Sequence, residues 1–325
     1  MKAITYQQYG GPEVLQLTSL EKPTPGEKEV LVKVHAASLN ALDWRMMRAS
    51  PFFLRLMQGL WKPKNGRLGA DMAGTIEAVG PGVTSYTMGD EVFGDILPAG
   101  GGAFSEYVCV DEEAVVPKPG NITFEDAASL PVAGLTALQG LRDLGKIRSG
   151  QKVLINGASG GVGSFAVQLA KLYDTEVTAI CSTGKADMVR SLGADHVIDY
   201  TREDFARNEK QYDLIFAANG DRPVSVYKKS LTPEGRYICA GGSMRQLFQA
   251  MLLGPWVTIG TRKKTGVVSA RMNREDLLYL GGLVASGKLV PMIDRQYKLE
   301  EAREAIRYLD EGHVLGKVIL TMVNE

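Results

Sequence analysis

The chain has 325 residues, of which 45% are hydrophobic and 23% are charged, and this ordinary globular composition suits about two domains. Its 37 basic residues balance its 37 acidic residues, so the formal net charge is zero. A balanced charge gives no long-range attraction to nucleic acid or to anionic lipid, and we expect neither as a partner.

Residues 1–122 are predicted to form a β-domain of barrel or sandwich type. The stretch is rich in Val, Gly, Pro and Thr, and turn pairs such as Pro25-Gly26 separate its short alternating runs. Many short strands with turns between them are typical of such domains. The runs that share this pattern are residues 2–7, 29–36, 74–79, 91–94 and 103–110.

Helical segments alternate with apolar β-runs after Pro117, which predicts a doubly wound parallel sheet of the Rossmann type. The tail is predicted to form two helices and then a strand, and a strand so far from the alternating repeats suits a return to the β-domain. We therefore expect an α/β fold divided into residues 1–122 with 270–325, and residues 123–269. The β-runs of the parallel sheet are residues 153–155, 176–181, 196–199, 213–216 and 235–239, and the tail elements are 273–287, 299–311 and 316–321.

Residues 153–163 carry a buried strand that ends in a glycine-rich turn, and residues 164–171 are predicted to continue as a helix. A strand, a glycine turn and a helix in this order form the phosphate site of dinucleotide-binding folds. Glycines let the backbone approach a pyrophosphate, and the helix N-terminus supplies N–H groups and a partial positive charge. An ordinary structural turn is the alternative. The residues expected at the phosphates are Ala158, Ser159, Gly160, Gly161, Val162 and Gly163.

The residues after the second strand of this fold indicate which nicotinamide coenzyme binds. NAD enzymes place Asp or Glu about 20 residues after the glycine turn, on the ribose hydroxyls. Here Ser182, Thr183 and Lys185 follow the strand, so we expect no carboxylate to repel a 2′-phosphate, while two hydroxyls and an ammonium can bind one. The sequence therefore predicts NADPH, with Tyr200 adding a phenol to the same phosphate. Simple packing of Tyr200 and a solvated Lys185 are the alternatives.

Asn219, Gly241 and Gly242 follow the fourth and fifth strands of the predicted sheet. Ligands of open α/β sheets bind at the carboxyl ends of the strands. We therefore expect these residues to approach the nicotinamide and its ribose, with ordinary turns as the alternative.

Several short motifs spread along the whole chain resemble those of a known family. They are Gly69-Ala70-Asp71-Met72-Ala73-Gly74, Gly89-Asp90-Glu91-Val92, Leu130-Pro131-Val132-Ala133-Gly134-Leu135-Thr136-Ala137, the glycine turn, Leu192-Gly193-Ala194-Asp195 and Gly312-His313-x-x-Gly316-Lys317. Together they resemble the medium-chain dehydrogenase/reductase superfamily in its zinc-free quinone oxidoreductase branch, which includes zeta-crystallin. The resemblance implies a GroES-like β-domain completed by the C-terminal segment, a Rossmann domain, and a homodimer that pairs the edge strands of two Rossmann sheets. Residues 256–261 or 266–271 are the candidate edge strand.

The same resemblance indicates whether this chain can bind the catalytic zinc of its zinc-dependent relatives. Asn40 and Ala70 stand where zinc-dependent relatives carry Cys and His, and Ala133 lies near the position of their remaining ligand. An amide and two methyl groups cannot hold Zn²⁺, which needs thiolate or imidazole ligands. We therefore predict that no metal is bound, and a zinc alcohol dehydrogenase is the alternative.

The three cysteines, Cys109, Cys181 and Cys239, lie far apart and show no CxxC spacing. We therefore expect neither a disulfide framework nor a cysteine zinc site, and a reducing cytoplasm suits the chain. Residues 1–20 resemble a strand rather than a secretory signal, and no uncharged apolar run reaches the ~20 residues that span a membrane.

A metal-free site favours hydride transfer to an electron-poor carbon over alcohol oxidation, because nothing there polarises an alcohol. In a quinone or an α,β-unsaturated ketone or aldehyde the charge spreads over a conjugated oxygen, which one or two hydrogen-bond donors can stabilise. The chemistry that the resemblance implies agrees with this. The resemblance assigns Asn40 as the donor to the substrate oxygen and Asp43 as an orienting residue or a turn cap. It assigns Thr136 to hold the nicotinamide ring, with an ordinary helix-interior threonine as the alternative. Lys317 is expected on the adenine side of the cofactor or at the surface.

Two further hypotheses stay open: a crystallin-like or regulatory protein that binds NADPH without turnover, and a 2-enoyl thioester reductase. By resemblance, such thioester reductases use a tyrosine in the first catalytic loop, and residues 40–45 contain none. The apolar residues 50–61 are predicted to form a pocket wall for a bulky hydrophobic substrate, or a core helix. Residues 244–256 form a second apolar stretch, at the same pocket or at the dimer interface.

Overall fold

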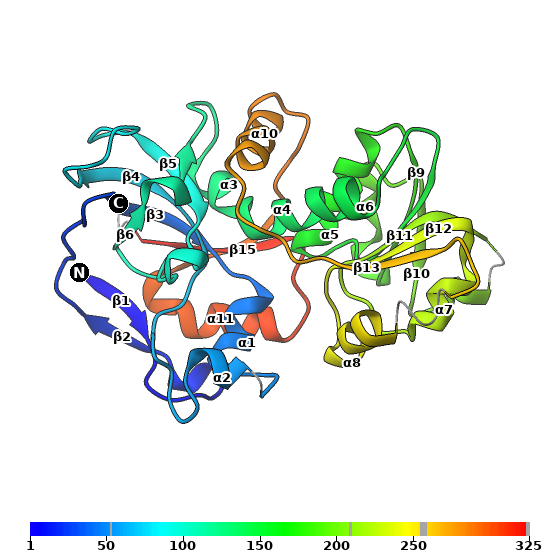
Figure 1. Ribbon diagram of the computed structural model, residues 1–325, viewed down its shortest axis with the longest axis horizontal. Helices are drawn as coiled ribbons and strands as arrows, with labels where there is room; N and C mark the ends of the chain where they lie inside the picture. The colour runs from blue at the N-terminus through cyan, green and yellow to red at the C-terminus, as the bar shows by residue number, and fades with distance from the viewer. Residues whose placement is uncertain (53, 208–209, 254–258, 323–325) are drawn as a thin grey trace. The chain divides into compact units, whose positions relative to one another are not determined.

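The computed structural model describes residues 1–325 except 53, 208–209, 254–258 and 323–325. The chain forms two compact units, Met1–Val132 with Met272–Glu325, and Ala133–Arg271 (Figure 1).

The first unit is built on a seven-stranded sheet. Its strands lie in the order β14-β15-β3-β4-β5-β7, and β6 pairs with β3. In β3, Val30, Val32 and Val34 alternate into the core with at most 1% exposure, as the two-residue period of a strand requires. The strands of this unit are the antiparallel pair β1 (Lys2–Thr5) and β2 (Gln16–Ser19), and β3 (Glu29–Ser38), β4 (Asp71–Val79), β5 (Glu91–Asp95), β6 (Tyr107–Asp111), β7 (Val116–Pro117), β14 (Ile293–Lys298) and β15 (Lys317–Thr321).

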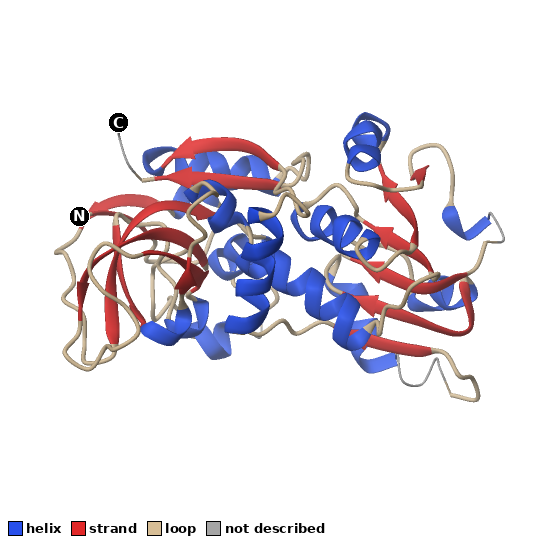
Figure 2. Cartoon of the chain, turned by 90° about the horizontal axis from the view of Figure 1, so that it is seen from above, coloured by secondary structure: helices blue, strands red, loops and turns tan. Residues whose placement is uncertain are grey.

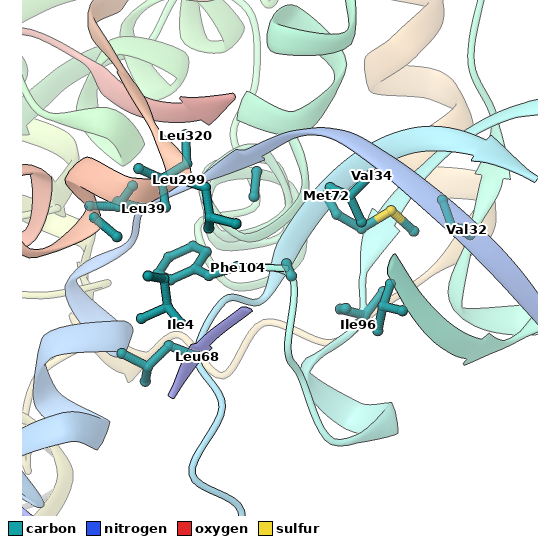
Figure 3. Packing of buried hydrophobic residues seen from close by; sticks show 14 of the residues in the cluster. Ile4, Val32, Val34, Leu39, Leu68, Met72, Ile96, Phe104, Leu299 and Leu320 are labelled. Atoms are coloured by element: carbon teal, nitrogen blue, oxygen red, sulfur yellow. The ribbon is translucent and has the colours of Figure 1, made fainter. Parts of the chain in front are cut away.

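Helices from both ends of the chain accompany this sheet. The core joins distant segments, because Phe104 packs with Ile4 of β1 and with Leu299 of the C-terminal segment (Figure 3). The C-terminal segment therefore completes the hydrophobic core of the first unit. The helices are α1 (Ala41–Arg48), α2 (Leu54–Gln58), α3 (Phe124–Ser129), α10 (Arg274–Ala285) and α11 (Ala302–Asp310), while α4 (Pro131–Gln139) begins here and continues in the second unit.

The second unit is a parallel sheet in the order β10-β9-β8-β11-β12-β13, with helices on both sides of the strands (Figure 2). Because both faces are covered, Val153, Leu154 and Ile155 of β8 are all 0% exposed. The strand order reverses between β8 and β11, and ligands of such sheets bind at this switch point. The elements are β8 (Lys152–Asn156), α5 (Gly161–Lys171), β9 (Glu176–Cys181), α6 (Ala186–Ser191), β10 (His196–Asp199), β11 (Tyr212–Ala217), α7 (Val224–Lys229), β12 (Leu231–Cys239), α8 (Met244–Phe248) and β13 (Lys264–Val267).

The fold class predicted from the sequence is confirmed, and the last strand does return to the β-rich unit, where β15 pairs antiparallel with β3. The first unit runs to Val132 and resumes at Met272, whereas the sequence pattern predicts that it ends at 122 and resumes at 270. The difference arises because α3 contacts β3 and β4. β14 pairs parallel with β15 and is a strand that the sequence pattern did not indicate.

The structure describes part of the two apolar stretches, residues 50–61 and 244–256, and part of the predicted edge strand. In residues 50–61 the described side chains of Phe52, Leu56, Leu60 and Trp61 are 44% to 87% exposed, so a core helix is wrong for them, and a pocket wall stays a prediction. β13 is an outer strand of its sheet and overlaps residues 266–271. Residues 254–258 lie outside the described part, and they belong both to the 244–256 stretch and to the other edge-strand candidate. Within the described residues, none of the helices has the length and apolarity needed to cross a membrane.

Candidate coenzyme site and candidate active site

The turn between β8 and α5 depends on two glycines for its shape. Gly157 has a φ of +79°, and a Cβ there would lie 2.7 Å from the Cβ of Asn219. A Cβ on Gly163 would lie 2.0 Å from the carbonyl oxygen of Gly157. Both positions therefore need glycine so that the strand, the turn and the helix can pack this closely.

Gly160 differs from these two, because the chain leaves room for a side chain there. A Cβ on Gly160 would find nothing closer than the carbonyl oxygen of Gly157 at 3.7 Å. Gly160 is the N-cap of α5, and the first amides of a helix have no acceptor within the helix. A pyrophosphate bound against these amides would lie close to the backbone of Gly160. It would explain a glycine at this position, which the packing of the chain does not require.

The structure brings the other predicted coenzyme residues to the same edge of the sheet. The N–H of Asn219 donates to the carbonyl of Asn156 over 3.2 Å, so the end of β11 lies against the turn after β8. Gly220 and Gly242 form a parallel bridge, which brings the end of β12 beside them. Ala158 is fully buried, and its N–H donates to the carbonyl of Ile180 at the end of β9. These residues therefore lie together at the switch point, and their contact with a coenzyme stays a prediction.

The corner beyond β9 holds a carboxylate that the residues following β9 do not indicate. The hydroxyl of Thr183 is hydrogen-bonded to Asp199, the last residue of β10. Thr201 donates to the same carboxylate from its N–H at 2.9 Å and its hydroxyl at 2.7 Å. The hydrogen bonds from Thr183 and Thr201 hold the pKa of Asp199 below its usual range, so it is charged at neutral pH. The expectation that no carboxylate lies here is therefore wrong.

Asp199 could have been found from the predicted topology. It stands opposite Cys181 in the register of β10 on β9, and neighbouring parallel strands end at one edge. Its charge is faced by Arg202, whose Nε lies 3.5 Å from Asp199 Oδ2. Ser182 and Lys185 are half-buried and belong to the same turn as Thr183, and Tyr200, which follows Asp199 in the chain, is 64% exposed. Their contact with a 2′-phosphate stays a prediction.

A buried polar cluster in the first unit surrounds Asn40, the N-cap residue of α1. The ammonium of Lys317 donates to Asn40 Oδ1 over 2.7 Å and to the carbonyl of Leu39 over 3.2 Å. Asn40 Nδ2 donates to Asp71 Oδ2 over 2.9 Å, and Ser38 Oγ donates to the same oxygen over 2.9 Å. The exposed fractions are 0% for Ser38 and Asp71, 3% for Lys317 and 7% for Asn40.

Three neighbouring strands assemble this cluster. β3 ends at Ser38, β4 begins at Asp71 and β15 begins at Lys317. Ser38 pairs with Asp71 on one side and with Ile319 on the other. The register of the sheet therefore brings a C-terminal lysine to the catalytic loop predicted near the N-terminus.

Burial disfavours the charged forms of Asp71 and Lys317, and the opposite charge of each favours the charged form of the other. Burial raises the pKa of Asp71, and the positive charge of Lys317 opposes that shift. Burial lowers the pKa of Lys317, and the negative charge of Asp71 opposes that shift. Asp95 pairs with Asp71 in the β4–β5 register, and burial raises the pKa of Asp95 to about 7.

Asp43 has both carboxylate oxygens engaged by backbone N–H groups. Asn40 N donates to Oδ2 over 2.7 Å, and Gly69 N donates to Oδ1 over 3.2 Å. The side chain therefore caps the first turn of α1 and ties it to the residue before Ala70. Burial raises the pKa of Asp43 to about 7. This geometry supports the turn-cap alternative, and it holds the Asn40 loop in place.

The predicted role of Lys317 needs correction. Its ammonium is buried at Asn40, so the surface alternative is wrong, and this position gives no support to a contact with the adenine. The link depends on pairing between strands that are far apart in the chain, so local sequence patterns do not indicate it. Thr136, predicted at the nicotinamide, is a buried residue of α4 in the second unit, and its role stays a prediction.

Comparison with known proteins identifies the family. Residues 26–120 match the alcohol dehydrogenase GroES-like domain, and residues 192–320 match the family described as zinc-binding dehydrogenase. The chain is 35% identical to the chloroplastic quinone-oxidoreductase QR1 of Triphysaria versicolor, over 98% of each chain. The chain belongs to the medium-chain dehydrogenase/reductase superfamily, in its quinone oxidoreductase-like branch.

Two further similarities agree with this membership. The chloroplastic NADPH-dependent alkenal/one oxidoreductase of Arabidopsis thaliana is 35% identical over 98% of this chain and 79% of that relative. The structure of the quinone oxidoreductase from Coxiella burnetii matches with a TM-score of 0.87 and 33% identity, over 99% of each chain. The predicted resemblance to the superfamily is confirmed.

The donor atoms of this medium-chain dehydrogenase/reductase do not fit the zinc in the name of one matching family. Asn40 Oδ1 faces an ammonium at 2.7 Å, and Ala70 supplies a buried methyl group. His35 is stacked on Phe124, and the ring of His196 is hydrogen-bonded to Glu176. In the part of the chain that the structure describes, no three His, Cys, Asp or Glu side chains are grouped to hold a metal. A cation at Asn40 would face the charge of Lys317.

Proposed function

We propose that the protein is an NADPH-dependent reductase that transfers hydride to a quinone, or to the activated C=C bond of an α,β-unsaturated ketone or aldehyde, without a metal. The observation that carries the proposal is the glycine turn at the switch point. The packing of the chain leaves room for a side chain at Gly160, so a bound phosphate explains why glycine stands there. The relatives named quinone oxidoreductase and alkenal/one oxidoreductase support the substrate class.

The chain's own residues have three tasks in such a reaction. A nicotinamide coenzyme supplies the hydride when it is bound. The amides at the start of α5 and the residues after β9, β11 and β12 bind and orient it. The amide of Asn40 donates a hydrogen bond to the acceptor oxygen on which negative charge collects. Thr136 contributes by holding the coenzyme ring in position.

The choice of NADPH rests on opposing charges at the corner beyond β9. Lys185 and Ser182 favour a 2′-phosphate, and the relative named NADPH-dependent agrees. Asp199 opposes it, although Arg202 lies beside that carboxylate. We propose that the cations outweigh the carboxylate, so that NADPH is preferred over NADH by a smaller factor than the residues after β9 alone suggest.

The proposal includes a homodimer formed through β13, one of the two outer strands of the parallel sheet, because an open strand edge is a ready surface for a second copy. It also includes the cytoplasm as the compartment, because three widely spaced cysteines suit a reducing environment. The relatives QR1 and alkenal/one oxidoreductase are named chloroplastic.

Coenzyme oxidation with a panel of acceptors tests the function. The panel contains benzoquinones, short and long alkenals, cyclic and acyclic enones and a crotonyl thioester, each with NADPH and with NADH. We expect turnover of quinones or enones, faster with NADPH. Tight NADPH binding without turnover of any acceptor would instead support a binding protein, and turnover of the thioester alone would support a thioester reductase.

A further inference from the structure

The ammonium of Lys317 is buried, and its hydrogen-bond acceptors are groups inside the protein. Its side chain is 3% exposed, and its Nζ donates to Asn40 Oδ1 and to the carbonyl of Leu39. Asp71 Oδ2 lies 3.6 Å from the same Nζ. Burying an ammonium is costly unless opposite charge and hydrogen bonds compensate, and here both are present.

The two charged neighbours of Asn40 admit only one orientation of its amide. An ammonium has only donors, so it can face the amide oxygen and not the amide nitrogen. An ionised carboxylate has only acceptors, so Asp71 can face the nitrogen and not the oxygen. Lys317 on one side and Asp71 on the other therefore exclude the flipped amide, which would place like groups against each other.

One hydrogen of the fixed amide is left with a poor partner. Nδ2 gives a good hydrogen bond to Asp71 at 2.9 Å, whereas the carbonyl of Ser38 lies 3.4 Å away. Asn40 is the most exposed member of the cluster, at 7%. The ammonium on Oδ1 also draws electron density from the amide and strengthens its N–H groups as donors.

We propose that Lys317 is a positioning residue for the reaction: its ammonium fixes and polarises the Asn40 amide, so that Nδ2 presents a hydrogen to the acceptor oxygen. The inference rests on the proposed function of Asn40. The positive charge that a metal would bring to this place thus comes from a lysine, and it acts on the substrate through an amide.

An exchange of the amide at position 40 with the carboxylate at position 71 tests the orientation of the Asn40 amide. In the double variant Asn40→Asp with Asp71→Asn the cluster keeps one amide, one carboxylate and one ammonium, and the carboxylate at position 40 faces Lys317. A merely structural cluster tolerates this exchange. Our inference predicts a folded protein with its NADPH dissociation constant within about twofold of wild type and with kcat reduced at least about 100-fold, because the donor is gone. Retained activity would overturn it.

Removal of the ammonium tests Lys317 itself. We expect Lys317→Met to lower kcat by about tenfold or more with little change in NADPH binding. Because this change leaves Asp71 buried without its cation, Lys317→Met with Asp71→Asn is a second variant that removes both charges, and the same loss is expected there. Unchanged kcat in both variants would contradict the inference.

A matched control exists in the same unit. The side chain of Lys118 is also buried, at 4% exposure, and its ammonium donates to the carbonyls of Pro119 and Ile122 and pairs with Glu91 at 2.9 Å. We expect Lys118→Met to lower the thermal midpoint without lowering kcat in the fraction that stays folded. A kcat loss equal to that of Lys317→Met would show that burial alone explains the effect.

A measurement without turnover separates this inference from the proposed function. Lys317→Met, Asn40→Ala and their combination form a cycle in unfolding experiments. We expect the combined change in the unfolding constant to be at least about fivefold smaller than the product of the single changes, as for residues in direct contact. If wild type reduces no acceptor, the proposed function fails while this coupling still decides whether Lys317 holds Asn40. Simple additivity would overturn the inference.

Discussion

The ammonium of Lys317 lies 2.7 Å from the amide oxygen of Asn40, although 277 residues separate the two in the chain. The contact exists because β15 pairs with β3 and both reach the loop that begins α1. It places a fixed positive charge directly against the amide that we propose as the donor to the substrate.

The glycine turn offers a pair of substitutions with opposite expected effects. In Gly160→Ala the added methyl group has room, so we expect an unchanged thermal midpoint but an NADPH dissociation constant at least about tenfold higher, because the methyl group takes the place of a phosphate. In Gly163→Ala the methyl group meets the Gly157 carbonyl at 2.0 Å, so we expect a loss of roughly 1–3 kcal/mol in the free energy of unfolding. Calorimetric titration and thermal unfolding check both. Normal NADPH binding by Gly160→Ala would argue against a phosphate site at the turn between β8 and α5.

Asp199 is expected to limit the preference for NADPH. Asp199→Asn keeps the size and an acceptor for Thr201 but removes a negative charge beside the predicted phosphate position. We expect the ratio of kcat/KM for NADPH over NADH to rise about fivefold. Asp187→Asn, at a fully exposed carboxylate of α6, is the matched control and should leave the ratio unchanged. The interpretation fails if both variants shift the ratio equally or neither does.

Lys185 is expected to act in the opposite sense. Lys185→Glu places a like charge near the 2′-phosphate, so we expect the KM for NADPH to rise by well over about tenfold, with little change for NADH. Lys185→Gln should give an intermediate KM. An unchanged KM for NADPH would show that another group reads the phosphate.

Much of the fold and the coenzyme site could be predicted, because their information is local. The alternation of helices and strands and the spacing of glycines around Gly160 depend on neighbours in the chain. Neither Lys317 nor Asp199 could be placed from local patterns alone, although the order of the parallel strands places Asp199 beside the end of β9. Lys317 meets Asn40 through strand pairing across the whole chain, and Asp199 meets Thr183 across two parallel strands. Apolar patterning likewise gave no indication that the side chains of Phe52 and Trp61 are exposed.

Asp43 makes stability depend on pH. Burial raises its pKa from 3.8 to about 7, so between these values the folded protein holds a proton that the unfolded chain has released. The stability from this group is complete below pH ~4 and is lost as pH rises through ~7, with a slope of at most about 1.4 kcal/mol per pH unit. Asp43→Asn should flatten the dependence in denaturant unfolding at pH 5 and pH 8, relative to wild type and to Asp187→Asn. A parallel dependence in Asp43→Asn would rule out this assignment.

The most direct measurement of the central claim is the turnover of NADPH with a quinone or an enone by protein whose metal content is determined in the same preparation, before and after treatment with a chelator. We predict turnover that the chelator does not change and zinc far below one equivalent. Activity that disappears on chelation and returns with Zn²⁺, or stoichiometric zinc at Asn40, would contradict a metal-free site built on Lys317 and Asn40.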